Sequence, residues 1–202
     1  YQTTPDWRLL SRFNVARSEA GALSSGDANY TEAVLGFGYR PVLNDRLNAL
    51  FKYSYLSDLS SPGQVGASGA ANPYEQRSHV LAVDGIYDLT PKFSIGGKLG
   101  YRFGQLRDSS VSGSDWFDSR AWLAIVRGDW HVVHAWDVLA ELRYLNAEEA
   151  QDAKSGALLG VYRHIDSHIK AGVGYNFTDF SDNLTDLSYR SHGWFINVLG
   201  KY

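Results

Sequence analysis

Residues 93–103 read FSIGGKLGYRF, and this stretch decides the fold. From Phe93 to Phe103 every second residue is apolar or glycine, whereas the residues between them are glycine or polar and include Lys98 and Arg102. Successive side chains of a β-strand point to opposite faces, so a period of two predicts a strand with one apolar and one polar face.

The same alternation recurs along the chain, and none of the apolar faces carries an ionised residue. The further segments are residues 7–15, 31–39, 47–55, 81–89, 122–130, 136–144, 157–161, 169–177 and 194–202. Together with residues 93–103 they predict about ten antiparallel strands in one domain that spans residues 1–202.

The opposite faces carry charges of both signs. In a barrel this small the inward side chains fill the interior, and buried charges need partners, so we expect a structural network of ion pairs. The alternative is a narrow polar pathway for small ions or solutes, in which the surplus of basic residues favours anions. The predicted lumen charge network comprises Arg12, Glu32, Lys52, Asp84, Lys98, Arg102, Arg127, Asp129, Glu141, Arg143 and Lys170.

A soluble sandwich or a lipocalin-like barrel also alternates apolar and polar residues, but it buries its aromatic residues centrally. Here the aromatic residues cluster near both ends of the apolar faces, which is typical of the two girdles of a transmembrane barrel. The predicted membrane-interface aromatics are Trp7, Tyr39, Trp130, Trp136 and Tyr202 at one end, and Tyr55, Tyr101, Trp122, Tyr144 and Trp194 at the other.

The connections between the predicted strands alternate between short and long. The short ones lie near residues 41–46, 89–92, 131–135 and 165–167, and the long ones span about 18–28, 58–76, 106–118, 147–155 and 178–191. Short periplasmic turns and longer extracellular loops produce this rhythm.

The chain ends within a strand, GWFINVLGKY, a form that the barrel assembly machinery of the bacterial outer membrane recognises. An even number of strands places both termini in the periplasm. Closure pairs the Trp7 strand with the Trp194 strand, because an open edge is not tolerated in lipid. The fold class is therefore all-β: a transmembrane antiparallel up-and-down β-barrel of about ten strands.

Composition excludes several function classes. No apolar run approaches the ~18 residues of a membrane-spanning helix. The formal net charge is −3 and no block of Lys or Arg occurs, so nucleic acid is not expected as a partner. The chain has no Cys, so a thiolate metal site is excluded, and we predict no cofactor. It also has no Met, so we expect that Tyr1 is not the start of translation.

The long loops are rich in acidic residues, among them residues 115–119, Glu148, Glu149 and Asp152. One interpretation is that divalent cations bridge these carboxylates to lipopolysaccharide phosphates, and the other is a solvated acidic rim. The last loop is unusually apolar, and we expect it to fold back over the barrel mouth. Its apolar residues are Phe180, Leu184, Leu187 and Tyr189.

Histidines do not indicate an enzyme. His79 and His192, near the long loops, share the parity of the apolar faces, so we expect them at the membrane interface and predict no catalytic residue. The others fall at the short-turn end, where a metal-binding cluster and solvated side chains are the two interpretations. These are His131, His134, His164 and His168.

Several segments resemble the C-terminal barrel region of large multidomain outer-membrane proteins of Gram-negative bacteria. They are DWRLLSRFN, GYRPVLNDRLNALFKYSYL, RSHVLAVDGIYDL, WFDSRAWLAIVR, GALLGVYRHI and GYNFTDFSDNLTDLSYRSHGWFINVLGKY. The resemblance covers nearly the whole chain, carries over no catalytic residues, and implies a barrel that anchors a longer polypeptide. We expect the lipid bilayer, lipopolysaccharide and the assembly machinery as partners. The alternatives are a narrow channel and adhesion through the loops.

Overall fold

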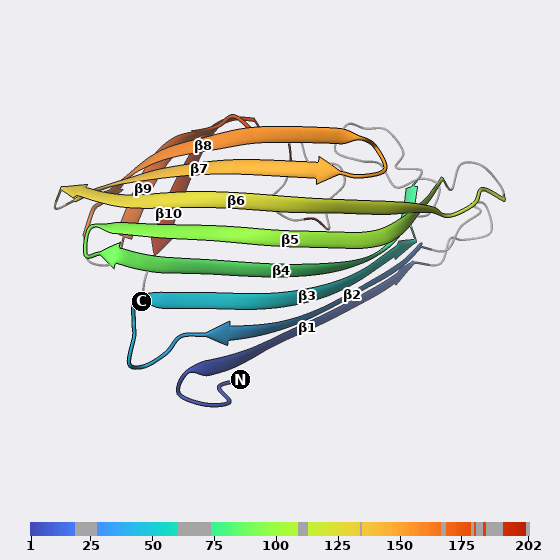
Figure 1. The fold of residues 1–202 in the computed structure, drawn as a ribbon, viewed down its shortest axis with the longest axis horizontal. Helices are drawn as coiled ribbons and strands as arrows, with labels where there is room; N and C mark the ends of the chain where they lie inside the picture. The colour runs from blue at the N-terminus through green and yellow to red at the C-terminus, as the bar shows by residue number, and fades with distance from the viewer. Residues whose placement is uncertain are drawn as a thin grey trace.

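The computed structural model describes residues 1–18, 28–59, 74–108, 113–133, 135–166, 169–178, 180, 184 and 192–200. Within these residues, ten strands form one antiparallel sheet in chain order, each bonded to its neighbours in the sequence (Figure 1). The strands are β1 (Trp7–Ser18), β2 (Ala28–Tyr39), β3 (Leu47–Leu59), β4 (Tyr74–Thr90), β5 (Phe93–Asp108), β6 (Phe117–Val133), β7 (Trp136–Ala147), β8 (Asp152–His164), β9 (Ile169–Asn176) and β10 (Gly193–Gly200).

The predicted fold class, an all-β transmembrane up-and-down barrel, is confirmed in the number, direction and order of the strands. None of the described residues belongs to a helix long and apolar enough to cross a membrane.

The apolar face of the sheet is its exposed face. In β5 and β6 the outward side chains of Leu99 and Val126 are 66% and 57% exposed, whereas the inward Leu123 is fully buried. The strand register places Leu99 between Val83 of β4 and Ala124 of β6, so the outward apolar residues form continuous rows. A soluble sandwich buries its apolar face, so this arrangement fits a barrel surrounded by lipid.

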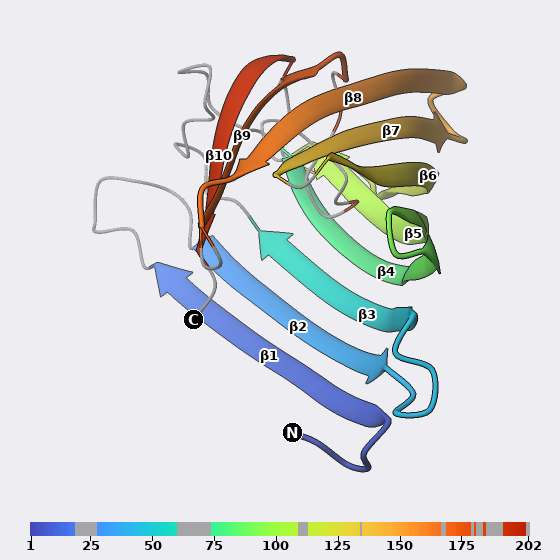
Figure 2. The same cartoon turned by 90° about the vertical axis from the view of Figure 1, so that its left-hand side faces the viewer.

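The sheet curls from β1 at the bottom of Figure 2 to β10 at the upper left, and its concave face surrounds the lumen. The predicted pairing of the first strand with the last is not present: among the described residues, β10 pairs only with β9, and the only strand that pairs with β1 is β2. At its start, the other edge of β1 is bonded by the N-terminal residues, through a bridge between Gln2 and Arg8 and hydrogen bonds between Tyr1 and Leu9. The rest of that edge, and the corresponding edge of β10, have no strand partner among the described residues.

The connections define two ends of the sheet. The turn end carries the connections 40–46, 91–92, 134–135 and 165–168, and the loop end carries 19–27, 60–73, 109–116, 148–151 and 177–192. The predicted alternation of short and long connections is confirmed except after β7. There β8 begins at Asp152, so the connection expected over 147–155 is only 148–151 and is shorter than the turn-end connection 40–46. Ala147 pairs with Asp152, and Gln151 closes the turn with a positive φ of 49°.

Replacing a lipid-facing leucine by arginine tests the outward orientation of β5. We expect Leu99→Arg to lower the free energy of unfolding in lipid vesicles by about 2–4 kcal/mol, because it places a charge near the bilayer midplane. Leu43→Arg is the matched control, since Leu43 is fully exposed but lies in a turn. Equal, small losses in denaturant titrations of both variants would contradict a lipid-facing position for Leu99.

Candidate functional site

The lumen is the candidate site, because the inward side chains of all the strands converge on it. Four ion pairs there join residues of the predicted network. They are Arg12 Nη2 with Glu32 Oε1 at 2.5 Å, Lys98 Nζ with Asp84 Oδ1 at 3.9 Å, Arg127 Nε with Asp129 Oδ2 at 2.9 Å, and Arg143 Nε with Glu141 Oε1.

Register and strand parity explain these pairs. Asp84 and Lys98 are directly opposite each other in the β4 and β5 register. Arg127 and Asp129, like Glu141 and Arg143, are two residues apart on one strand, so both members of each pair point inward. The Glu141 and Arg143 side chains are each only 9% exposed, which makes theirs the most buried of the four pairs.

Glu32 is the centre of a polar cluster on β1 and β2. Its carboxylate accepts hydrogen bonds from Asn14 Nδ2 at 2.8 Å and Tyr30 Oη at 3.2 Å, in addition to the ion pair with Arg12. These three donors offset the loss of solvation at an acidic side chain that is only 12% exposed.

Three basic residues of the predicted network depart from the expected pairing. Lys170 pairs with Asp137, an inward residue of β7 that the sequence analysis left out. Arg102 is 3% exposed and donates from Nη2 to Gln76 Oε1 at 3.3 Å, but its Nε has no hydrogen-bond partner among the described residues. Within the described part of the chain neither Arg102 nor Lys52 has a carboxylate partner. Buried charges without a counter-ion are unfavourable, so Arg102 stands out in this lumen.

An apolar cluster lies on the inner face of the sheet toward the loop end. Phe180 and Leu184, from the connection after β9, are 5% and 8% exposed and pack against Val80, Leu123 and Ile125 of the wall. We call these five residues the lumen plug. The expected inward folding of the last loop is confirmed for Phe180 and Leu184, whereas Leu187 and Tyr189 lie outside the described residues.

Two glycines and a buried threonine position the plug. Thr178 is fully buried, and it donates from its backbone N to Asn176 Oδ1 at 3.0 Å and from Oγ1 to the Ala157 carbonyl at 3.3 Å. A Cβ at Gly156 would lie 2.4 Å from Thr178 Oγ1, and one at Gly100 would lie 3.0 Å from Leu184 Cδ1. The wall therefore lacks side chains where the last loop enters.

A pocket of about 360 Å³ lies on the concave face between strands β3 and β7. Its charged lining consists of Asp84, Lys98, Arg127 and Glu141, and each of these residues belongs to one of the ion pairs described above. The lumen thus combines an apolar cluster with a pocket lined by paired charges.

The predicted interface aromatics that the structure describes lie in two outward rows. At the turn end the Trp7 and Tyr39 rings are 4.7 Å apart, and Trp130 and Trp136 are 53% and 43% exposed. At the loop end the interacting or exposed residues are Tyr55, Tyr101, Trp122, Tyr144 and Trp194. Tyr202 lies outside the described residues. The role of the rows at the membrane interfaces stays a prediction.

His79 belongs to the loop-end aromatic row. Its Nδ1 is 2.7 Å from the Tyr53 hydroxyl, and its ring lies 5.0 Å from those of Tyr55 and Phe103. This outward position among aromatic rings agrees with the parity argument made from the sequence.

Three of the described acidic residues at the loop end, Asp118, Glu149 and Asp152, pair with basic side chains. Glu149 lies 3.3 Å from Arg120, which also pairs with Asp118 at 3.5 Å, and Asp152 lies 3.4 Å from Lys154. These ion pairs favour the solvated-rim interpretation for residues 115–119 and 148–152. Asp179, Asp182 and Asp186 lie outside the described residues.

The buried and the exposed ion pairs offer a matched test of the lumen network. We expect Glu141→Ala to lower the free energy of unfolding by about 3–5 kcal/mol, because it leaves Arg143 buried without a partner. Asp118→Ala, which removes a carboxylate whose side chain is 56% exposed, should cost less than about 1 kcal/mol. A denaturant titration that gives equal losses would show that Glu141 faces solvent.

Comparison with known proteins identifies the fold. No family model matches the sequence, and no curated protein is similar to it. Among solved structures, the chain is similar to the NanC porin with a TM-score of 0.56 and 12% sequence identity, over 98% of each chain. This likeness shows that the chain has the fold of a porin-type β-barrel.

Proposed function

We propose that this chain is a structural barrel of the bacterial outer membrane that anchors a larger envelope protein. The observation that carries the proposal is the content of the lumen: the lumen plug packs against the inner wall toward the loop end, and ion pairs lie on the inner face of β4 to β7. A barrel whose interior is occupied by its own side chains has the properties of an anchor rather than of an open pore.

Energetics support a plug that stays in place without a ligand. Burial of a Phe or Leu side chain stabilises a protein by about 1.5–3 kcal/mol, and both Phe180 and Leu184 are buried. Expelling them would expose these side chains and leave Thr178 without the backbone acceptor at Ala157. The plug therefore resists spontaneous opening.

Closure and orientation complete the proposal. Because lipid cannot satisfy free backbone groups, we propose that β1 and β10 pair in the bilayer. The first strand begins and the last strand ends at the turn end, which corresponds to the periplasmic side of bacterial barrels. In this orientation both termini are periplasmic, and an upstream domain would lie in the periplasm. The assembly machinery would recognise the final strand, Gly193–Gly200 and the residues after it.

The loop end offers an outward surface for lipopolysaccharide. Arg77 and Arg107 lie 4.7 and 4.8 Å from the centre of the Trp116 ring, beyond the loop-end aromatic row. Arginine binds phosphate well, so we propose that this surface contacts the lipid headgroups. The inward burial of Phe180 and Leu184 argues against adhesion through the last loop, and we do not propose it.

A narrow channel is the second candidate. It is favoured by the similarity to a porin, by the pocket of about 360 Å³, and by Arg102, a buried guanidinium without a carboxylate partner that would attract an anion.

Single-channel conductance of the refolded barrel in a planar bilayer separates the two candidates. We expect the wild-type barrel to be silent. The double variant Phe180→Ser and Leu184→Ser should conduct with anion preference, because it replaces the two plug residues of the last loop by small polar side chains. Leu43→Ser, in an exposed turn, is the control and should stay silent. Steady openings of the wild-type barrel would contradict the anchor and favour the channel.

A further inference from the structure

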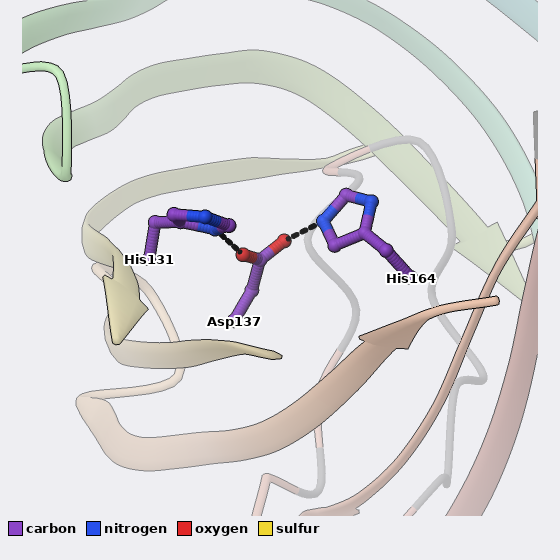
Figure 3. A group of neighbouring side chains, drawn as sticks. All are labelled: His131, Asp137 and His164. Carbon is purple, nitrogen blue, oxygen red and sulfur yellow. Dashed lines mark hydrogen bonds and ion pairs between the residues drawn. The ribbon is translucent and has the colours of Figure 1, made fainter. Parts of the chain in front are cut away.

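Three side chains with metal-binding atoms meet at the turn end of the lumen (Figure 3). His131 Nδ1 lies 2.5 Å from Asp137 Oδ1, and His164 Nε2 lies 2.8 Å from Asp137 Oδ2. One ligand atom from each residue can be chosen so that all three lie within 4.8 Å of one another. Among the described residues this is the one group of three or more His, Cys, Asp or Glu with such geometry.

The strand register brings these residues together from three strands. His131 near the end of β6 is directly opposite Asp137 at the start of β7. Asp137 is opposite Tyr162 of β8, and His164 lies two residues further along that strand on the same face. All three have inward parity, so their side chains converge in the mouth of the lumen.

We propose that His131, Asp137 and His164 form a binding site for a divalent transition-metal ion, with Zn²⁺ the best match. Two imidazole nitrogens and a carboxylate are ligands that zinc uses in proteins, and a site with three protein ligands leaves a fourth position for water. Tetrahedral bonds of ~2.0–2.1 Å place ligand atoms about 3.3 Å apart, so small side-chain rotations suffice to adapt this cluster. The inference rests on the fold and is independent of the proposed anchor function.

The site is accessible to water, and Lys170 would compete with a metal ion for Asp137. The His131 and His164 side chains are 38% and 41% exposed, whereas Asp137 between them is 15% exposed. Lys170 of β9 contacts Asp137 Oδ2, and its ammonium lies 4.9 Å from the Tyr162 ring. Without a metal, Lys170 supplies the positive charge beside the carboxylate. A bound cation would displace it from Oδ2, so metal and Lys170 compete for Asp137.

A metal at this position would join β6, β7 and β8 at the turn end. Because the ion binds the folded barrel and not the separated strands, it would raise the stability of the fold.

Calorimetric titration of the metal-free, untagged, refolded full chain with Zn²⁺ tests the proposal. We expect one zinc ion per chain. The single variants His131→Ala, His164→Ala and Asp137→Asn should each weaken zinc binding by at least about tenfold. Mutation of a residue that only hydrogen-bonds to a metal ligand already costs about 10–100-fold in affinity, and loss of a ligand itself should cost no less. His79→Ala, which removes a histidine at the opposite end, is the matched control and should bind like the wild type.

The variant Lys170→Gln distinguishes the proposed site from zinc binding by the two histidines alone, because only the proposed site uses Asp137. Lys170 carries a positive charge that repels the bound zinc ion. Its removal should therefore tighten zinc binding by about tenfold, which corresponds to a small part of the Coulomb repulsion between two neighbouring charges in a partly exposed site. Binding unchanged in this variant, or unchanged in both histidine variants, would overturn the proposed ligand set.

A measurement on the wild-type chain keeps the proposal testable if the variants fail to fold. Co²⁺ in place of Zn²⁺ should produce the intense visible absorption of a four-coordinate ion, and Zn²⁺ should remove it. Zinc should also raise the midpoint of thermal unfolding followed by circular dichroism. Absence of both effects in the wild-type barrel would overturn the site.

Discussion

Backbone hydrogen bonding in lipid is the constraint on which the rest of the structure depends. No water is present in the bilayer core to bond a free N–H or C=O group, so each strand must bond to its neighbours. The sheet satisfies this for β2 to β9, each of which pairs on both sides. The pairing fixes the register, and the register fixes which side chains point outward. The apolar outer rows around Leu99 and the polar inner positions are consequences of this constraint.

The content of the lumen follows from the same geometry. A barrel of about ten strands is narrow, so inward polar side chains lose water and must find partners inside. Glu32, Asp84 and Glu141 find basic partners, and the last loop supplies Phe180 and Leu184 to fill the space that these pairs leave at the loop end. At the turn end, where water enters, the histidine cluster combines partial burial with access.

Much of the fold could be predicted because period-two alternation is a local property. The outward rows and the inward charges follow from parity within single segments such as residues 93–103, and the up-and-down strand order follows from the connections between successive segments. Properties that depend on register between strands could not be predicted this way. The tight 148–151 connection needed the pairing of Ala147 with Asp152, and the grouping of Asp137 with His131 and His164 needed three aligned strands. The sequence did indicate that the last loop turns inward, but not that Val80, Leu123 and Ile125 receive it.

The central claim is that the curled sheet closes into a barrel in the membrane, and cysteine cross-linking tests it most directly. The chain has no Cys, so an introduced pair is unambiguous. Ser11→Cys on β1 would be combined in turn with Trp194→Cys, Ile196→Cys and Val198→Cys on β10, all at outward positions. A disulfide needs Cα atoms about 4.4–6.8 Å apart, so closure predicts that one of these pairs is efficiently oxidised in vesicles, whereas Ser11→Cys with Val126→Cys on the far wall is not. Failure of all three β10 pairs in correctly folded protein would contradict closure.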